Sequence, residues 1–350
     1  MPGKTGWILA VNAGSSSLKL SGFGADGVQV FARTLADTSV ADLSRKTLAG
    51  IIQCEAYGAG CAPAPCSVGH RIVHGGPLSA PAELTPEVMA DVEAAAAFAP
   101  LHNPPALHMV GLMRALFPDA RQFGCFDTAF HARNPVEAVT LPIPAELREA
   151  GLRRYGFHGL SYASTLRRFE KVAGATLPDR LLIAHLGAGA SLAAVKAGRG
   201  VATTMGFSPM DGLVMATRAG ALDPGVIFHL VRAGHTPDEV ETLLNKESGL
   251  LALGGSPSMK ELTDRTDAEA RAAVTQFCYW VTRHAGSMIA AMGGIDGMVF
   301  TGGIGENAKG IRADVTRRLA WTGLNSDRVW VVPADEEGEI ARSVRDLLTA

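Results

Sequence analysis

The chain has 350 residues, of which 47% are hydrophobic and 19% charged, with a formal net charge of -2. The length indicates two or more domains with sizeable cores, and the composition excludes a disordered chain. The charge balance excludes bulk electrostatic attraction to nucleic acid or to an anionic membrane, so we expect a small-molecule partner.

The cysteines and the N-terminal segment bear on the cellular compartment. Five cysteines are spread through the chain and never form a C-x-x-C pair: Cys54, Cys61, Cys66, Cys125 and Cys278. Their odd number and wide spacing are typical of free thiols in a reducing compartment. The apolar stretch at residues 7–11 is too short for the core of a signal peptide, and no uncharged apolar run reaches membrane-spanning length. We therefore expect a cytoplasmic protein that does not enter membranes.

The first half of the chain predicts strands and helices in alternation. Residues 8–23 have the pattern of a buried strand, a serine-rich turn and a second strand that carries Lys19. Residues 85–100 and 103–117 predict helices, the second with Asn103 as its cap before two prolines. A short strand is expected to end at Asp127, followed by a mostly helical segment interrupted by glycines around His158.

The second half begins with a pattern similar to the first. Residues 180–199 again predict strand, small-residue turn and strand, and Ser191 aligns with Ser17. Such an echo is what a duplicated two-domain fold leaves behind, although unrelated hairpins also resemble one another. The remaining residues predict helices at 223–234, 236–255 and 267–292, then a strand, a glycine turn and a helix, and finally a strand and a helix. This alternation indicates the α/β class.

Three glycine-rich turns each follow an apolar strand, at residues 12–17, 187–191 and 302–307. Glycine lets backbone N–H groups converge on an anion, and serine hydroxyls add donors without bulk. A single turn of this kind is most often only a turn, but three of them together with Lys19 favour a nucleotide or polyphosphate site. A Walker loop is excluded, because the Gly-Lys-Thr near the N-terminus has no strand before it.

Eight segments resemble the motifs of the acetate kinase family, in their order and at close to their spacing, over nearly the whole chain: VNAGSSSLKL, GHRIVHGG, LHNPP, FDTAFH, YGFHGLSY, HLGAGAS, MDGLVMATRAGALDPG and FTGGIGEN. The resemblance implies a duplicated actin-like, ribonuclease H-like α/β fold with an active-site cleft between two domains. The N-terminal domain would comprise residues 1–128 plus 337–350, and the C-terminal domain residues 129–336. It further implies reversible transfer of the ATP γ-phosphoryl group to acetate with Mg²⁺ or Mn²⁺, giving acetyl phosphate and ADP, by a homodimer.

The same resemblance implies roles for the charged residues. Arg71 matches the arginine that binds the acceptor, and Arg218 matches the arginine that stabilises the transition state. His158 matches a donor to the equatorial oxygens of the transferring phosphoryl group. Asp127 matches an essential aspartate, which we interpret as orienting an arginine or a magnesium-bound water, since ionised acetate needs no base.

The other implied site residues form three groups. Asn12 and Glu336 match magnesium positions, where oxygen ligands are expected. Val73, Leu101 and Pro209 match a small apolar pocket for the methyl group. The implied nucleotide-binding residues are Ser17, Lys19, His185, Leu186, Gly187, Ala188, Gly189, Ser258, Met259, Lys260, Gly303, Ile304, Gly305, Glu306 and Asn307.

The chain departs from the family pattern at several positions. Ala188 stands where an asparagine is usual, and Ser258 and Lys260 stand where an aspartate and an arginine are usual. Tyr162 replaces a second histidine, and the chain is shorter than typical members. From Ser258 and Lys260 we hypothesise a relaxed choice of phosphoryl donor, extending to GTP or pyrophosphate. Two alternatives stay open: a kinase of propionate or another short-chain carboxylate, and a non-catalytic nucleotide-binding switch.

Overall fold

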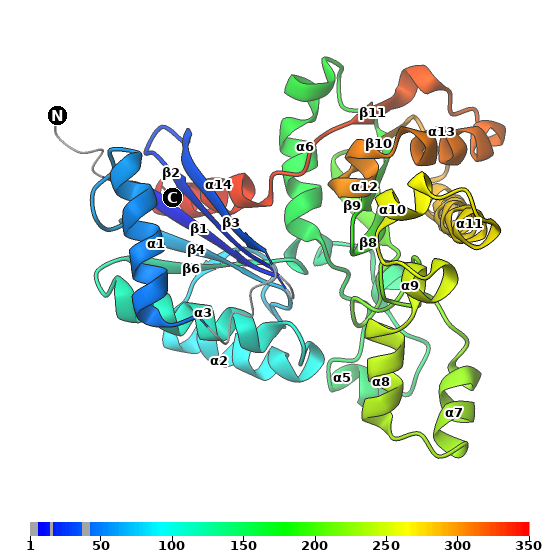
Figure 1. The fold of residues 1–350 in the computed structure, drawn as a ribbon, viewed down its shortest axis with the longest axis horizontal. Helices are drawn as coiled ribbons and strands as arrows, with labels where there is room; N and C mark the ends of the chain where they lie inside the picture. The colour runs from blue at the N-terminus through cyan, green and yellow to red at the C-terminus, as the bar shows by residue number, and fades with distance from the viewer. Residues whose placement is uncertain (1–5, 15–16, 37–42, 350) are drawn as a thin grey trace. The chain divides into compact units, whose positions relative to one another are not determined.

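The structure is a computed structural model that describes residues 6–14, 17–36 and 43–349 (Figure 1). The chain divides into two compact units, with bounds Met1–Ala132, His158–Ser164 and Asp335–Ala350 for the first and Arg133–Phe157 and Thr165–Ala334 for the second. Helix α6 (Gly159–Ala173) therefore starts in the first unit and continues in the second. Each unit is built on one sheet.

The sheet of the first unit has the strand order β3-β2-β1-β4-β6-β5. Strands β1, β2 and β3 form an antiparallel meander, and β4 and β6 are added parallel to β1 on its other side. The bounds are β1 Ile8–Ala13, β2 Ser17–Phe23, β3 Gln29–Ala36, β4 Ser67–Ile72, β5 Ala82–Glu83 and β6 Arg121–Phe126. The predicted strand, turn and strand over residues 8–23 is confirmed, while Ser15 and Ser16 of its turn lie outside the described residues.

Alternate side chains of β1 enter cores on opposite faces of this sheet. Leu9 and Val11 pack with residues of α1 (Arg45–Gly58) and α3 (Asn103–Leu116). Ile8 and Ala10 pack with residues of α14 (Glu336–Thr349) on the other face. Because both faces are covered, the first four residues of β1 form a continuous apolar run rather than an alternating one. Helix α2 (Pro86–Ala95) contributes to a further core cluster with α3.

The sheet of the second unit repeats this topology. Its order is β11-β10-β7-β8-β9, with β7, β8 and β9 in an antiparallel meander and β10 and β11 added parallel to β7. The bounds are β7 Arg180–Leu186, β8 Ala190–Lys196, β9 Arg199–Thr203, β10 Gly297–Thr301 and β11 Val329–Val331. Both the predicted α/β class and the predicted duplication are confirmed, because the same five-strand connectivity occurs twice.

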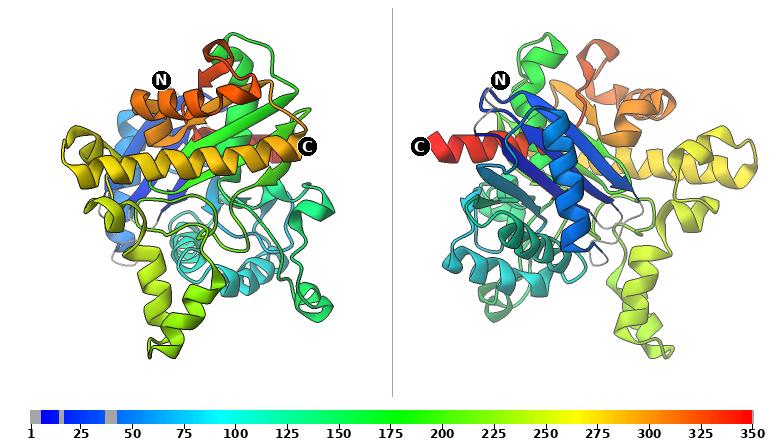
Figure 2. Two further views of the ribbon diagram at one scale, coloured as in Figure 1. Left: turned by 90° about the vertical axis from the view of Figure 1, so that its right-hand side faces the viewer. Right: turned by 60° about the vertical axis from the view of Figure 1, so that its left-hand side comes forward.

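Helices of the second unit cover its sheet and extend from it. The longest, α11 (Ala268–Met292), packs on β7, β8 and β9 and lies across the strands in the view of Figure 2. The N-cap of α11 is Asp267, whose carboxylate accepts from the amide of Ala270 at 2.9 Å. The remaining helices are α4 Val136–Val139, α5 Ala145–Glu149, α7 Pro224–Arg232, α8 Pro237–Lys246, α9 Gly249–Gly254, α10 Met259–Asp264, α12 Gly302–Asn307 and α13 Lys309–Arg318.

The sequence predicts Asn103 as the cap of α3, and this prediction is wrong. The cap position is His102, and Asn103 is the first helical residue. Its side chain instead accepts from the amide of His74 at 3.0 Å and donates to the carbonyl of His74 at 2.9 Å. The side chain of Asn103 therefore binds the backbone of His74 instead of capping its own helix. These two hydrogen bonds hold the segment that follows β4.

The predicted third glycine turn, at residues 302–307, is also wrong. Only Gly302 forms the turn, with φ of 77°, and the segment then continues as α12. A Cβ at Gly302 would lie 2.8 Å from the carbonyl oxygen of Leu186, so a side chain there would clash with β7. The consequence is that a helix N-terminus, rather than a loop, follows β10.

Over the described residues, no helix is both long and apolar enough to cross a membrane.

Candidate active site

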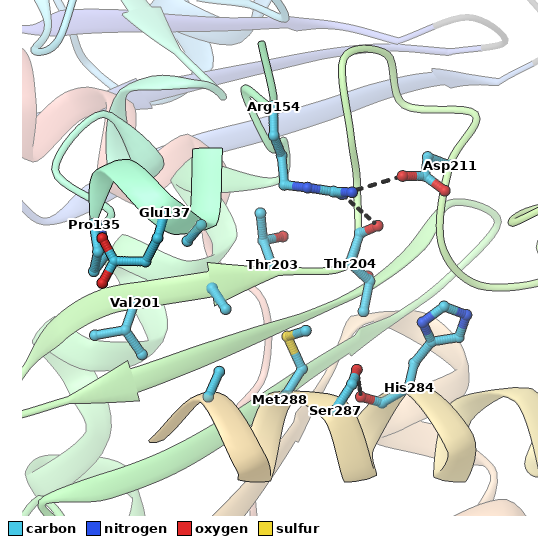
Figure 3. Close-up of a pocket in the computed structure, with 13 residues that line it drawn as sticks. Pro135, Glu137, Arg154, Val201, Thr203, Thr204, Asp211, His284, Ser287 and Met288 are labelled. Carbon is cyan, nitrogen blue, oxygen red and sulfur yellow. Dashed lines mark hydrogen bonds and ion pairs between the residues drawn. The ribbon is translucent and has the colours of Figure 1, made fainter. Parts of the chain in front are cut away.

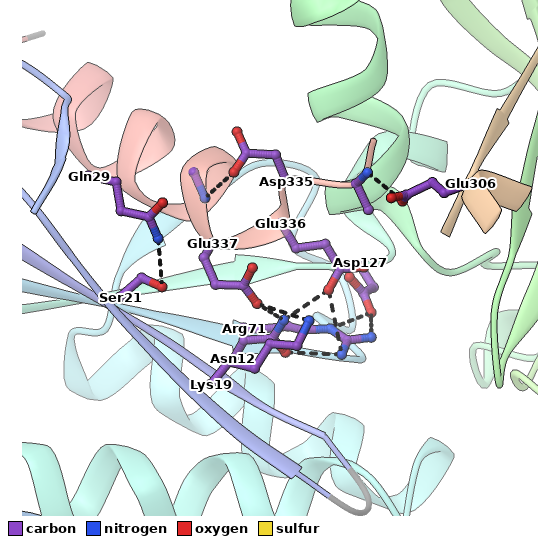
Figure 4. A network of polar contacts seen from close by, with 12 residues as sticks. Asn12, Lys19, Ser21, Gln29, Arg71, Asp127, Glu306, Asp335, Glu336 and Glu337 are labelled. Atoms are coloured by element: carbon purple, nitrogen blue, oxygen red, sulfur yellow. Dashed lines mark hydrogen bonds and ion pairs between the residues drawn. The ribbon is translucent and has the colours of Figure 1, made fainter. Parts of the chain in front are cut away.

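Arg71 and Asp127 form a buried ion pair at the ends of adjacent parallel strands in the first unit (Figure 4). Arg71 is near the end of β4, and Asp127 directly follows β6, where its amide donates to the carbonyl of Ile72 at 3.1 Å. Nε and Nη2 of Arg71 both donate to Oδ2 of Asp127, at 3.0 and 2.6 Å. The side chains are 16% and 1% exposed, so the pair is shielded from water on most sides.

The charges of this pair depend on each other. Burial alone lowers the pKa of Arg71, but the neighbouring carboxylates, first that of Asp127, outweigh burial and raise it. Burial raises the pKa of Asp127, and the nearby carboxylate of Glu336 adds to this, while Arg71 acts in the opposite direction. A guanidinium stays protonated at any physiological pH, so the arrangement fixes a positive charge at a defined place.

Asn12 connects the ion pair to the start of α14. Its Oδ1 accepts from Nη1 of Arg71 at 3.1 Å, and its Nδ2 donates to Glu336 at 2.9 Å and to Glu337 at 2.7 Å. Lys19 faces Asn12 across the β1–β2 pair, and its Nζ lies 3.6 Å from Glu337 (Figure 4). Its side chain is 47% exposed. One network thus holds two cations and several carboxylates.

Glu337 is a member of this network that the sequence reasoning missed. The available signal was the acidic first turn of the final helix, which Glu337 shares with Glu336 and Glu339. Acidic residues are common at helix N-termini because they stabilise the helix dipole, so the pattern by itself does not point to a site.

The oxygen atoms here match the ligands that Mg²⁺ prefers. Asn12 and Glu336 both lie in the network, and Glu337 and Asp127 add further carboxylate oxygens. Among the residues that the structure describes, no three acidic, histidine or cysteine side chains are grouped closely enough to enclose a metal by themselves.

His158 is held beside Asp127 by an unusual backbone. Its φ is 59°, the left-handed region that non-glycine residues rarely adopt, and its side chain is buried. The next amide, of Gly159, donates to the carbonyl oxygen of Asp127 at 2.9 Å, and a Cβ on Gly159 would collide with that oxygen. Strain of this kind persists where surrounding contacts impose it, and it is common in active sites.

A cavity of about 770 Å³ lies in the second unit, where three predicted nucleotide-binding segments meet. Its lining comes from the β7–β8 turn, from α10 with the residues before it, and from α12. The predicted residues on its wall are Gly187, Ala188, Ser258, Met259, Lys260, Gly303, Ile304 and Asn307. Pro257, Thr263, Asp264 and Ala308 also line it and were not predicted. Sequence spacing could not reveal them, because they enter through the packing of α10 and α12.

The other predicted nucleotide-binding residues of the second unit support this wall. The amide of Gly187 donates to the carbonyl of Gly189 at 2.9 Å, which closes the turn. His185 and Leu186 lie in β7, and Gly305 packs on Phe300. Glu306 accepts from the amides of Gly302 at 3.0 Å and Ala334 at 2.9 Å. Ser17 and Lys19 belong to the first unit, where Ser17 begins β2.

The remaining predicted residues are divided between the units. Val73 is 7% exposed and Leu101 is 42% exposed in the first unit. In the second unit, Nη1 of Arg218 donates to the carbonyl of Pro209 at 3.1 Å. The structure therefore brings Arg218 and Pro209 together.

Three comparisons with known proteins bear on this site. The model of the acetokinase family matches residues 65–343. An acetate kinase of Rhodopseudomonas palustris strain TIE-1 is 44% identical over 302 residues, covering 79% of this chain and 76% of that protein. The crystal structure of Porphyromonas gingivalis acetate kinase has a TM-score of 0.86 at 32% identity and covers 98% of this chain and 100% of its own. The crystal structure of a propionate kinase from Francisella tularensis has a TM-score of 0.87 at 29% identity, and the match covers 97% of this chain and 99% of that chain. These two structures confirm the predicted actin-like fold.

Proposed function

This chain belongs to the acetokinase family, and from that premise we propose that it transfers the γ-phosphoryl group of ATP reversibly to acetate. The observation that carries the proposal is the buried Arg71–Asp127 pair. Three of the five N–H donors of Arg71 are used within the first unit, by Nε, Nη1 and Nη2. The two others are available to a carboxylate acceptor.

Phosphoryl transfer to acetate requires positive charge in the site rather than a general base. Acetate is already ionised at neutral pH, and the transferring phosphoryl group carries its charge on three equatorial oxygens. In our proposal Arg71 orients the acetate, while His158 and Arg218 donate to those oxygens. Asp127 is a positioning residue that fixes the guanidinium plane of Arg71. Mg²⁺ brought with the nucleotide would neutralise phosphate charge, and Asn12 and Glu336 would hold it through water.

The acceptor series tests which acid is used. The likeness to a propionate kinase favours propionate as a second acceptor, and Val73, Leu101 and Pro209 are proposed to contact the acyl chain. One methylene in a fitted pocket is worth about 1–3 kcal/mol, so butyrate should be a poor substrate while acetate and propionate are both accepted. Acyl phosphate formation measured with each acid decides this, and equal kcat/KM for all three would contradict a fitted pocket.

The wall of the cavity supports a relaxed choice of phosphoryl donor. The hydroxyl oxygen of Ser258 accepts from the amide of Glu261 at 3.3 Å as the cap of α10, and a hydroxyl cannot accept from sugar or base hydrogens as an aspartate does. Lys260 is exposed at the same helix start. We expect comparable kcat/KM for ATP and GTP, with pyrophosphate as a third donor to compare. A strict preference for ATP would contradict the proposal.

Replacing Lys19 by alanine should lower kcat/KM for the nucleotide about tenfold, since a hydrogen bond to a charged group contributes about 1.5–3 kcal/mol. In our proposal Ser17 and Lys19 bind the nucleotide phosphates. The side chain is 47% exposed, so the melting temperature should not change. Lys196→Ala, at the exposed end of β8, is the matched control. An unchanged kcat/KM for the nucleotide in the Lys19 variant would show that Lys19 does not bind the phosphates.

A homodimer built on α7 accounts for an exposed apolar patch. Five large apolar side chains of this region are 38–57% exposed: Leu222, Val226, Ile227, Phe228 and Val231. A contiguous apolar surface on one helix marks a protein interface. We propose that a second copy of the chain covers it.

Phe228→Asp should convert the dimer to a monomer, because it would bury an unpaired carboxylate at the centre of the patch. Light scattering coupled to gel filtration measures the mass. Tyr57→Asp is the control, since Tyr57 is 89% exposed on α1 in the other unit. A monomeric parent protein, or a Phe228 variant that keeps the dimer mass, would refute this interface.

A cytoplasmic location completes the proposal. All five cysteines are free in the structure, as expected in a reducing compartment.

A further inference from the structure

Two charged side chains, Lys260 and Asp264, line the cavity of about 770 Å³ in the second unit, and both belong to α10. They are four positions apart, so they share one face of the helix and lie one turn from each other. Both residues are exposed, and neither side chain makes a hydrogen bond or an ion pair with any other residue that the structure describes. The wall of this cavity thus presents a cation and a carboxylate that a ligand can use.

A second cavity of the same unit differs in this respect. It has a volume of about 480 Å³ and lies against β9 and α11 (Figure 3). Its arginine, Arg154, forms an ion pair with Asp211 at 3.1 Å, and Nη1 of Arg154 also donates to the carbonyl of Met205 at 2.8 Å. The cation on that wall is therefore neutralised within the protein, whereas the two charges of α10 are not.

The stability of α10 does not account for its two cavity-lining charges. Lys260 is the second residue of the helix and Asp264 is the last. A cation near the N-terminus and a carboxylate at the C-terminus both oppose the helix dipole, and a lysine four positions before an acidic residue is the less favourable order for an ion pair. Because both placements cost stability, binding a ligand is the role that explains them.

The spacing of the two charges matches one part of a nucleotide. One helical turn rises about 5.4 Å, which is close to the separation of the α-phosphate of a nucleotide from the two adjacent hydroxyls of its ribose. The donors on the far edge of the base lie much farther from that phosphate. A phosphate bound by Lys260 therefore brings the ribose hydroxyls, rather than the base, to Asp264.

We propose that Asp264 binds the ribose of the phosphoryl donor by accepting hydrogen bonds from its two hydroxyls. The inference rests on the proposed nucleotide site, and a carboxylate is also the partner of ribose in the dinucleotide-binding folds. Ser258, where the family usually has an aspartate, caps the start of α10 and brings no carboxylate. Asp264 supplies one from the other end of the same helix. Because ATP and GTP carry the same ribose, this contact does not distinguish their bases.

Binding of ADP and of 2′,3′-dideoxy-ADP, measured by isothermal titration calorimetry, tests the contact without any turnover. Asp264→Ala should raise the dissociation constant of ADP about tenfold or more, because a hydrogen bond to a charged group is lost. The same variant should leave the constant of the dideoxy nucleotide unchanged, and the constant of GDP should rise as that of ADP does. Glu247→Ala, which removes an exposed carboxylate directly after α8, is the matched control and should change none of the constants.

Two results would overturn the role of Asp264 in ribose binding. One is an unchanged dissociation constant of ADP in Asp264→Ala. The other is an equal loss of ADP and of 2′,3′-dideoxy-ADP, which would place the carboxylate on the base or the phosphates. The melting temperature of Asp264→Ala should be equal to or above that of the parent, since the removed charge opposes the helix dipole. A lower melting temperature would show a structural role and would also overturn the assignment.

The outcome for Asp264 can be separated from that for the proposed function. Acyl phosphate formation from ATP, with unchanged nucleotide constants in Asp264→Ala, would leave the kinase activity in place and exclude the ribose contact. The expected changes in the nucleotide constants, in a protein that forms no acyl phosphate, would keep the ribose contact and refute the kinase activity.

Discussion

Arg71→Ala is expected to lower kcat/KM for the acid by about 10²- to 10³-fold, the largest effect of any single substitution in this account. Removing one donor that stabilises charge in the transition state costs about 2.7–4 kcal/mol, and about 1.4 kcal/mol corresponds to a factor of ten. The loss should affect both the KM for the acid and kcat, because in our proposal the same guanidinium binds the carboxylate and offsets the charge that approaches the phosphoryl group. Steady-state acyl phosphate formation measures it.

Two further variants keep this expectation testable if Arg71→Ala is unstable. Arg71→Lys retains the charge but not the planar fork, and it should recover little of the activity. Arg33→Ala removes an exposed arginine of the same unit, whose closest carboxylate lies at 3.9 Å, and it should leave kcat/KM unchanged. An Arg71 variant that is folded and retains wild-type kcat/KM would exclude this residue from acceptor binding.

Asp127→Asn is expected to lower kcat about 10²-fold, because an uncharged amide leaves the guanidinium of Arg71 less well oriented. The remaining carboxylate nearest to that guanidinium is Glu336, at 4.0 Å, and it would draw Arg71 toward α14. The variant leaves the buried guanidinium of Arg71 with Glu336 as its nearest carboxylate, so its melting temperature should fall, and kcat is compared at a temperature at which the variant is folded. KM for the nucleotide should change less than kcat.

The pH profile distinguishes a positioning role of Asp127 from a role as a general base. If Asp127 positions Arg71, the rate of Asp127→Asn should be lower by the same factor at every pH at which wild-type Asp127 is ionised. A base would instead impose an acidic limb on the wild-type profile, and the variant would lose that limb. Loss of the limb in Asp127→Asn would contradict the positioning role.

The duplication could be predicted from the sequence because its physical cause is local. Residues 8–11 and 181–184 are continuous apolar runs, as strands covered on both faces must be, and each strand is followed by small residues and a second strand. The same local logic located the turn between β7 and β8 and the long helix that begins directly after Asp267. The site residues were identified from the order of the family motifs.

The rest of the site depends on contacts between segments far apart in the chain. Glu337 enters the network through Asn12, which lies 325 positions away, and no sequence spacing encodes that contact. Asp264 lines the cavity of the second unit together with residues of α12, which lies far from it in the sequence. The left-handed backbone of His158 likewise follows from the bond between the next amide and Asp127. In each case tertiary packing, not local propensity, decides the outcome.

The most direct test of the central claim is acyl phosphate formation from acetate and ATP with Mg²⁺, trapped as the hydroxamate, with Arg71→Ala as the blank. The account predicts hydroxamate in proportion to enzyme and time, and its loss in the blank. A folded protein that binds ATP but forms no hydroxamate from acetate or propionate would contradict the account and favour a non-catalytic nucleotide-binding role.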